Sequence, residues 1–495
     1  MVGVPGRSKA CATCKARHIK CDEGRPTCNR CKKAGFHCQG YERPTVFVDE
    51  TPWIRGKHGF LQGKDAGDKI VHASVHASVH ASVHASPRGA VDMQKRLSPD
   101  IVRFLGGLFV SQDADFSMWR YLTSPELDAS MTKRPSIPGV TLRAVALGLY
   151  GRVNRHAISL EQAAQLYGLA LRGVRCELLN PVALSSTSIL MSIFNLSLYE
   201  WVACTSRPAW KYHLRALSHL IEKRGPAAFC QGPERRAFEQ ARSVICIMAI
   251  KDRKRTFLGE DVWQAVPWSI SPESKCYINR LIDIICCIPA MIEDCDALRL
   301  IKAEETRTWL RNAIHERIVA LQRRLFDIRW KWEISHPNAC HEVKMDGGGA
   351  SHLSVDDNGD PLFDSLLCYR DLRSAVVIGL YNTCFLFLRE YAAEIGVSVE
   401  ISPDARRFTK KTNPALAFPN EVRSLREIAR EICRSAEFYL RPGHGITGAY
   451  FLIFPLRVAQ LVYGSHENDR EARWIRRMMK YIGDRYGFSI VYEFC

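Results

Sequence analysis

Six cysteines near the start of the chain follow a spacing that constrains the fold more tightly than any other feature. The pattern is C-x2-C-x6-C-x6-C-x2-C-x6-C, formed by Cys11, Cys14, Cys21, Cys28, Cys31 and Cys38. Zinc prefers four ligands in a tetrahedron, so six thiolates can satisfy two zinc ions only if two of them bridge both metals. Because such a short segment has almost no apolar core, we expect it to fold only as it binds metal.

Other interpretations of these cysteines are weaker. A disulfide knot needs an oxidising compartment, but the chain opens with Met-Val-Gly-Val-Pro-Gly-Arg, which is no apolar secretory signal, and its 19 cysteines are an odd number. A single zinc held by four thiols would leave two cysteines unused. His18 and His37 are further candidate ligands, but the six thiols already complete two sites.

The residues around the cysteines carry a specific resemblance. Ala10-Cys-Ala-Thr-Cys-Lys-Ala-Arg-His-Ile-Lys-Cys-Asp22, Arg25-Pro-Thr-Cys28 and the run from Cys31 to Cys38 resemble the fungal Zn2Cys6 binuclear cluster. The resemblance implies two zinc ions as cofactor, with Cys11 and Cys28 as the bridging thiolates and Pro26 in the loop between the halves. It also implies a nuclear, zinc-dependent, DNA-binding regulator of genes transcribed by RNA polymerase II.

Basic side chains between the cysteines supply candidate DNA contacts. We expect a short helix over Lys15–Lys20, and the resemblance implies that its end enters the major groove at a CGG-type triplet. Arg17 and His18 would face base edges, where guanine O6 and N7 accept hydrogen bonds. The expected phosphate contacts are Lys15, Lys20, Arg30, Lys32 and Lys33. A solvated helix face is the alternative, and His18, where the family often has Lys, leaves the triplet preference open.

The distribution of charge also indicates that the N-terminal segment contacts DNA. The chain has a net charge of +17 at pH 7, and residues 1–45 hold ten Lys/Arg against three acidic residues. The remaining 450 residues hold the other +10, a much lower density. We therefore expect the N-terminal arm, residues 1–45, to bind double-stranded DNA, and we expect no membrane partner.

A length of 495 residues predicts at least two structural units. We expect a small metal-stabilised Zn2Cys6 cluster domain at 1–45, a disordered linker at 46–100 and a large all-α domain at 101–495. The linker holds four tandem Val-His-Ala-Ser copies at 71–86, and an expanded disordered repeat is favoured over a metal site there. No heptad pattern is visible in 41–100, so monomeric binding and a homodimer through the large domain both stay open.

Apolar residues at helical spacing predict the all-α domain. The three stripes are Leu160, Ala163, Tyr167, Ala170, Leu171, Val174 and Leu178; Leu310, Ile314, Leu321, Leu325 and Ile328; and Trp474, Ile475, Met478, Met479 and Ile482. The run Thr187–Cys204 contains Asn195 and Glu200, which predicts a buried helix rather than a membrane span. The glycine-rich, acidic segment Ser335–Asp364 predicts a surface loop, with an activation patch as the alternative.

Dispersed motifs in this region resemble the helical regulatory domain of filamentous-fungal cluster regulators. They are Leu198-Tyr-Glu200, His213, Arg224-Gly-Pro226, Arg235, Arg242, Arg255-Thr-Phe-Leu258, Trp263-Gln264, Pro267-Trp268, Phe454-Pro-Leu456 and Tyr481-Ile-Gly483. We expect them to serve in caps, turns and core packing, with Arg224-Gly-Pro226 at a helix end. The resemblance implies that the large domain controls activity by binding a metabolite, a partner or a second copy. It also implies contact with the transcription machinery and control of a biosynthetic gene cluster.

Enzymatic activity is not indicated. The sequence has no Gly-rich phosphate loop, no His-Glu-x-x-His helix and no Gly-x-Ser-x-Gly elbow, and His341-Glu342 lacks the second His.

The thirteen cysteines outside the cluster, such as Cys286 and Cys287, are expected in the core, with a redox pair as the alternative. The alternative function is a zinc-dependent protein-interaction scaffold, which predicts no steep salt dependence of binding to any duplex.

Overall fold

The computed structural model describes residues 10–17, 19–24, 27–38, 136–180, 186–345, 353–397, 411–418, 421–464 and 469–493. They belong to two units, one within Met1–Ala73 and the other within Ser74–Cys495. The predicted linker at 46–100, with its Val-His-Ala-Ser repeats, lies outside the described residues, as does 101–135.

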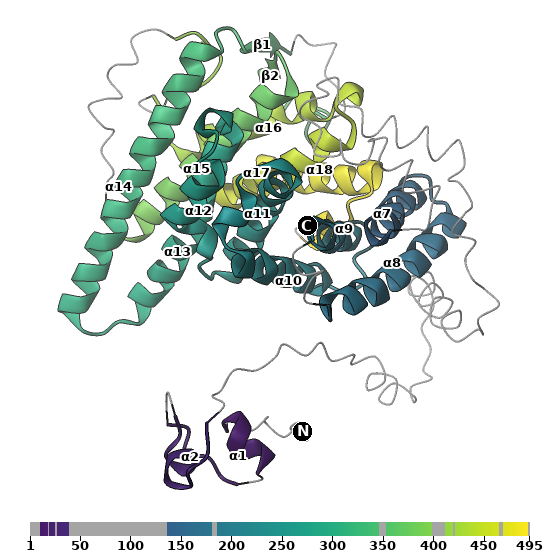
Figure 1. Ribbon diagram of the computed structural model, residues 1–495. Helices are drawn as coiled ribbons and strands as arrows, with labels where there is room; N and C mark the ends of the chain where they lie inside the picture. The colour runs from purple at the N-terminus through teal and green to yellow at the C-terminus, as the bar shows by residue number, and fades with distance from the viewer. Residues whose placement is uncertain are drawn as a thin grey trace, which may run out of the picture. The chain divides into compact units, whose positions relative to one another are not determined.

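The first unit contains two short helices, α1 (Ala12–Ala16) and α2 (Asn29–Lys33), each directly after the first thiol of its half (Figure 1). The Sγ atom of Cys11 accepts a hydrogen bond from the backbone N–H of Cys14 at 3.3 Å, and Cys28 does the same for Cys31 at 3.3 Å. The bounds predicted for this helix, Lys15–Lys20, are therefore wrong, because the sulfur of Cys11 starts the helix earlier and the chain leaves it at Arg17.

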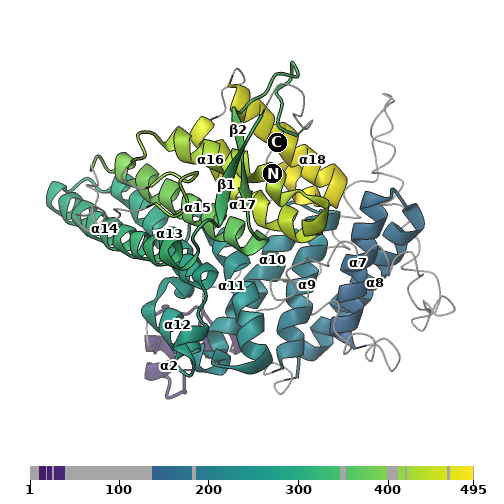
Figure 2. The ribbon, with the colours of Figure 1, turned by 90° about the horizontal axis from the view of Figure 1, so that it is seen from above.

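The second unit is built almost entirely of helices, as Figures 1 and 2 show. Its first helices are α7 (Ile137–Val153), α8 (Ala157–Leu178), α9 (Thr187–Ala203), α10 (Ala209–Arg224), α11 (Gly232–Asp252), α12 (Asp261–Ala265), α13 (Tyr277–Leu300) and α14 (Glu304–Ser335). After the strands β1 (Cys340–Lys344) and β2 (Ser365–Tyr369) follow α15 (Leu372–Glu394), α16 (Leu425–Tyr439), α17 (Gly445–Tyr463) and α18 (Arg470–Tyr486). The predicted all-α class is confirmed, with one two-stranded sheet among the described residues.

Helices that follow one another in the chain pack side by side in this unit. Helix α7 contacts α8 and α9, α9 contacts α10, and α13 contacts α11, α14 and α15. Helix α18 lies beside α17 and contacts α7, the first helix described in this unit (Figure 2). Residues of all three helices belong to one hydrophobic core.

The predicted apolar stripes form the buried faces of α8, α14 and α18. All five residues of the α18 stripe are buried, and four of the five in α14 are buried while Leu310 is partly buried. In α8 the prediction failed at Leu171, which is exposed, whereas Leu166 lies in the core. Helix α10 ends at Gly225 with a φ of +73°, which confirms the predicted helix end at Arg224-Gly-Pro226.

The segment Ser335–Asp364 is only partly the predicted surface loop. Strand β1 pairs antiparallel with β2, from Cys340 opposite Tyr369 to Lys344 opposite Ser365. Two acidic residues that follow β1 contact α18, since Asp356 pairs with Arg470 at 2.7 Å and Asp357 with Arg477 at 2.9 Å. These contacts favour a structural role for the acidic run.

The apolar helices belong to the core of this unit. Helix α9 is the buried helix predicted from Thr187–Cys204, and the Nδ2 of Asn195 donates to the Oγ1 of Thr141 at 3.1 Å. Glu200 accepts from the Thr205 hydroxyl at 2.7 Å, and burial raises the pKa of its carboxyl. Two helical segments, Leu372–Glu394 and Pro442–Tyr463, are long and apolar enough to cross a membrane, but 89% and 72% of their apolar windows are buried within the protein.

Cysteines outside the cluster are mostly core residues, as predicted. Of the twelve that the structure describes, the seven buried ones are Cys246, Cys286, Cys295, Cys340, Cys368, Cys384 and Cys433. The Sγ atoms of Cys246 and Cys286 lie 2.9 Å apart within this core. A redox role for this pair stays a hypothesis.

Candidate metal centre and nucleic-acid interface

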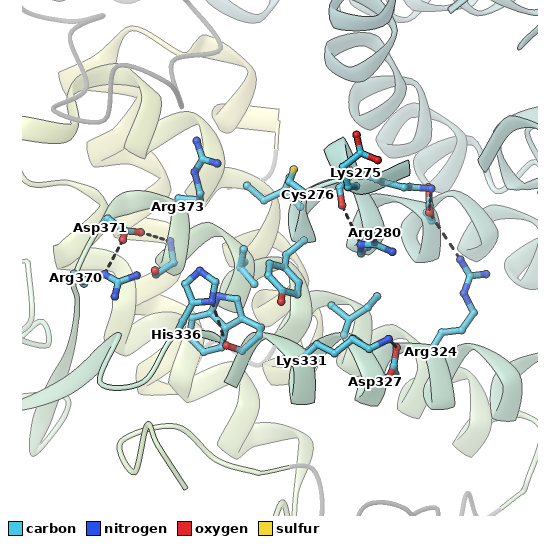
Figure 3. A pocket seen from close by; sticks show the side chains of 18 residues that line it. Lys275, Cys276, Arg280, Arg324, Asp327, Lys331, His336, Arg370, Asp371 and Arg373 are labelled. Carbon is cyan, nitrogen blue, oxygen red and sulfur yellow. Dashed lines mark hydrogen bonds and ion pairs between the residues drawn. The ribbon is translucent and has the colours of Figure 1, made fainter. Parts of the chain in front are cut away.

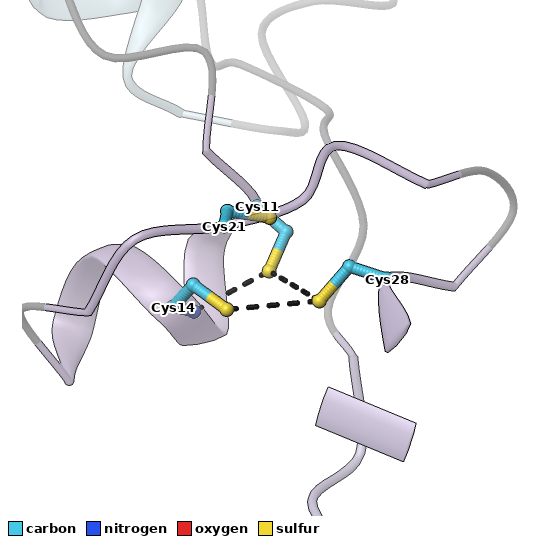
Figure 4. A group of neighbouring side chains, drawn as sticks. All are labelled: Cys11, Cys14, Cys21 and Cys28. Carbon is cyan, nitrogen blue, oxygen red and sulfur yellow. Dashed lines mark hydrogen bonds between the residues drawn. The ribbon is translucent and has the colours of Figure 1, made fainter. Parts of the chain in front are cut away.

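The first unit is organised around the sulfur atoms of its cysteines (Figure 4). The Sγ atoms of Cys11 and Cys28 lie 3.7 Å apart, and that of Cys14 lies 3.6 Å from that of Cys28. The Sγ of Cys31 lies 3.8 Å from that of Cys11. A tetrahedral zinc with Zn–S bonds of about 2.3 Å places its sulfurs about 3.8 Å apart, so these spacings suit zinc coordination.

All six cysteines fall into two groups of four in which the sulfurs lie within 4.8 Å of one another. One group is Cys11, Cys14, Cys21 and Cys28, and the other is Cys11, Cys28, Cys31 and Cys38. The two groups share Cys11 and Cys28, the residues that the resemblance assigns as bridges. Two tetrahedra with two common sulfurs need six thiolates, which is the number this unit supplies.

Contacts between the halves hold this arrangement. Cys11, Cys14, Cys28 and Cys31 are fully buried and make up the small core of the unit. The carboxylate of Asp22, from the first half, accepts hydrogen bonds from the backbone N–H groups of Asn29 and Arg30 at 3.0 and 3.2 Å. It thus caps α2, and these hydrogen bonds to its ionised form help lower the pKa of Asp22.

The predicted DNA contacts that the structure describes lie on the surface of this unit. They are Arg17, Lys20, Arg30, Lys32 and Lys33, all exposed and none in an ion pair with another described residue. Lys15 belongs to α1, but its side chain, like the whole of His18, lies outside the described residues. Exposed cations that have no acidic partner among the described residues are the side-chain type that phosphate contacts require.

Phe36 is a residue of this surface that the sequence analysis missed. Phe36 is 50% exposed, and the Cζ atom of Arg17 lies 3.8 Å from the centroid of its ring. The hydroxyl of Thr13 donates to the carbonyl oxygen of His37 at 3.0 Å and holds the same two segments together. Phe36 follows α2 in the second half of the repeat, and Arg17 follows α1 in the first half. The second half thus helps to position the Arg17 guanidinium.

The dispersed motifs of the helical unit serve mainly in packing, as expected. Three cations surround the ring of Trp268, with Arg235 at 4.6 Å, Arg242 at 4.8 Å and Lys275 at 4.3 Å from its centroid. Arg242 is fully buried and pairs with Asp283. These contacts are those of a core network and do not resemble a catalytic constellation.

Comparison with known proteins adds to this geometry. Residues 9–46 match the fungal Zn(2)-Cys(6) binuclear cluster domain, and residues 140–258 match the fungal specific transcription factor domain. The chain is 23% identical over 290 residues to an uncharacterized protein of Emericella nidulans, covering 56% of this chain and 60% of that protein. It is 54% identical over 39 residues to the aspercryptin biosynthesis cluster-specific transcription regulator of the same organism, covering 8% of this chain and 6% of the regulator.

These matches cover less than two thirds of the length of either relative, and no solved structure matches the chain. Both matched domains agree with the two units described above. A Zn(2)-Cys(6) domain binds two zinc ions, and the six-cysteine cluster is compatible with that cofactor. The chain therefore carries a fungal Zn(2)-Cys(6) binuclear cluster domain followed by a fungal specific transcription factor domain.

Proposed function

We propose that this protein is a nuclear, sequence-specific regulator of RNA polymerase II transcription whose binding to DNA depends on two zinc ions. The observation that carries the proposal is the pair of four-sulfur groups beneath a surface of unpaired cations. In this proposal all six cysteines are zinc ligands, and Cys11 and Cys28 bridge the metals. The protein acts by binding and has no catalytic step.

Base recognition is assigned to the region where α1 ends. Arg17 directly follows the helix, and its guanidinium lies against the ring of Phe36. This contact orders a long cationic hydrogen-bond donor at the surface. In the proposed complex Arg17 and His18 face base edges of a CGG-type triplet in the major groove, where guanine offers two acceptors to a guanidinium. Lys15, Lys20, Arg30, Lys32 and Lys33 contact phosphates and fix the register.

The proposal is tested by fluorescence anisotropy on a CGG-containing duplex and on a scrambled duplex, with and without a chelator. Two zinc ions per cluster are expected by elemental analysis. Removing them should abolish specific binding, because the cysteines make up the core of the described part of this unit. Fewer than two zinc ions, or specific binding that survives metal removal, would contradict the proposal.

The roles of single side chains are tested with the same duplexes. Arg17→Ala should cost about 1–3 kcal/mol of binding to the CGG duplex if the guanidinium contacts a base. Unchanged discrimination between the duplexes in this variant would remove that assignment. A protein-interaction scaffold would show no steep fall of affinity with salt on either duplex, whereas phosphate binding predicts one.

Control of a biosynthetic gene cluster is the further part of the proposal. It is supported by the match to a relative described as an aspercryptin biosynthesis cluster-specific transcription regulator, although that match is confined to 39 residues. Mapping genome occupancy of the protein tests it, because a cluster regulator should occupy promoters that lie together in one group of genes. Occupancy scattered over unrelated promoters would contradict a cluster-specific role.

A further inference from the structure

A pocket in the helical unit lies between the start of α13, the second half of α14 and the start of α15 (Figure 3). Its volume is about 710 Å³, within the range of about 300–1,000 Å³ that small-molecule sites occupy. Part of its wall is apolar or aromatic, including Tyr277, Ile328, Trp332 and Val377. A ligand that fills this space can therefore bury a carbon skeleton as well as polar groups.

The charged residues around the pocket are unbalanced. Its six Lys and Arg residues are Lys275, Arg280, Arg324, Lys331, Arg370 and Arg373, and its four acidic residues are Glu273, Asp283, Asp327 and Asp371. Figure 3 shows Arg370 and Arg373 on one side, and Lys275, Arg280, Arg324 and Lys331 on the other. An anion in the pocket would thus meet cations from both sides.

The imbalance is strongest around Asp283, whose side chain is only 5% exposed. This one carboxylate pairs with Arg242 and with Lys275, and the Nη2 of Arg324 lies 3.9 Å from its Oδ2. Arg242 and Lys275 are themselves nearly buried, at 1% and 10% side-chain exposure. These two buried cations against one carboxylate leave one positive charge in surplus where water screens it poorly, and Arg324, at 43% side-chain exposure, adds a third cation nearer the solvent. A bound anion would offset the cost of that buried charge.

Two of the other three acidic residues are already occupied by protein partners. Asp327 pairs with Lys331 at 2.7 Å, and Asp371 pairs with Arg370 at 3.2 Å and caps α15 through the backbone N–H of Ser374 at 2.7 Å. Arg280 is exposed and forms no ion pair with any described residue. Its Nε donates to the carbonyl oxygen of Lys275 at 3.0 Å, which leaves the two Nη groups for a ligand.

We propose that this pocket binds a small organic dianion, either a dicarboxylate or a phosphate monoester. Arg280 donates to one anionic group, the surplus around Asp283 attracts the charge, and the carbon skeleton lies against Tyr277 and Val377. Arginine suits both ligand types because its guanidinium donates two parallel hydrogen bonds to carboxylate or phosphate oxygens. The site does not depend on the DNA-binding proposal, which concerns the other unit.

The test is isothermal titration calorimetry on the full-length, zinc-loaded protein at about 150 mM salt, where long-range attraction is screened. Succinate, adenosine monophosphate, inorganic phosphate and acetate are titrated in turn. Saturable binding of one equivalent of succinate or of adenosine monophosphate is expected, and which of them binds separates a carboxylate from a phosphate ligand. Acetate, with one charge and little carbon, should bind at least about tenfold more weakly.

Three variants separate a built site from general attraction to a basic protein. Arg280→Ala should weaken binding about tenfold, and Asp327→Asn should strengthen it, because it removes an acidic group from the wall. Arg307→Ala is the matched control, since Arg307 is a half-exposed arginine of α14 paired with Glu304, outside the pocket. No saturable binding of either dianion, equal losses in Arg280→Ala and Arg307→Ala, or weaker binding in Asp327→Asn would overturn the proposal.

Discussion

Replacing Phe36 with alanine should weaken binding to a CGG-containing duplex about twofold to fivefold, while leaving binding to a scrambled duplex unchanged. In the structure the Cζ of Arg17 lies 3.8 Å from the Phe36 ring centroid, and Phe36 is 50% exposed. A cation–π contact at so exposed a position contributes about 0.5–1 kcal/mol, which corresponds to this change in affinity. The effect is specific because the contact orders a side chain assigned to base edges rather than to phosphates.

A double-mutant cycle measures the contact itself. Anisotropy titrations of the unmodified protein, Arg17→Ala, Phe36→Ala and the double variant on the CGG duplex should give a coupling energy of about 0.5–1 kcal/mol. If the two losses simply add, Phe36 does not act through Arg17 and the reasoning is refuted.

Folding of the arm must be excluded as the cause of any loss. Phe36→Tyr keeps an aromatic face for the guanidinium and should bind the CGG duplex like the unmodified protein. Each variant should retain two zinc ions, because Phe36 lies in neither four-sulfur group. A lower zinc content in Phe36→Ala would show that the ring supports the fold instead of positioning Arg17.

Three other substitutions have distinct expected results. Lys32→Ala should weaken binding to both duplexes alike and lower the slope of log affinity against log salt by about one, measured by anisotropy at several salt concentrations. Asp22→Ala removes two hydrogen bonds to the start of α2 and should destabilise the arm by about 1 kcal/mol, seen as zinc loss at lower chelator concentration. Asp283→Asn should cost the helical unit about 3–5 kcal/mol in urea unfolding, because Arg242 stays buried without a counter-charge, whereas Arg242→Met with Asp283→Leu should cost less.

The metal centre follows closely from the sequence because the thiols that define the pattern are also the candidate ligands. The spacing predicts six sulfurs in one centre, and the resemblance assigns Cys11 and Cys28 as bridges, the two residues that both four-sulfur groups share. The local helix was predicted less well. A helix of five residues shows no periodicity, and its start depends on a sulfur that accepts from the backbone N–H of Cys14.

Contacts between distant residues escaped the sequence analysis. Arg17 and Phe36 lie in different halves of the repeat, so no local pattern links them. Strands β1 and β2 are five residues each. Strand β1 buries only its first residue, Cys340, and β2 buries four of its five residues. Neither strand therefore shows the alternation that identifies a half-buried strand. The long stripes of α14 and α18 were predictable because each spans several turns on one buried face.

Net charge alone would not locate a nucleic-acid surface in this chain, because many cations of the helical unit are already neutralised. Arg253 pairs with Asp296 at 2.6 Å, and Arg477 pairs with Asp357 at 2.9 Å. The described cations of the arm have no such partners, and Asp22, an acidic residue among them, is occupied as a helix cap. Affinity for DNA grows with the number of phosphates that free cations neutralise. The proposed DNA surface therefore rests on the exposed cations described in the arm rather than on the total charge of the chain.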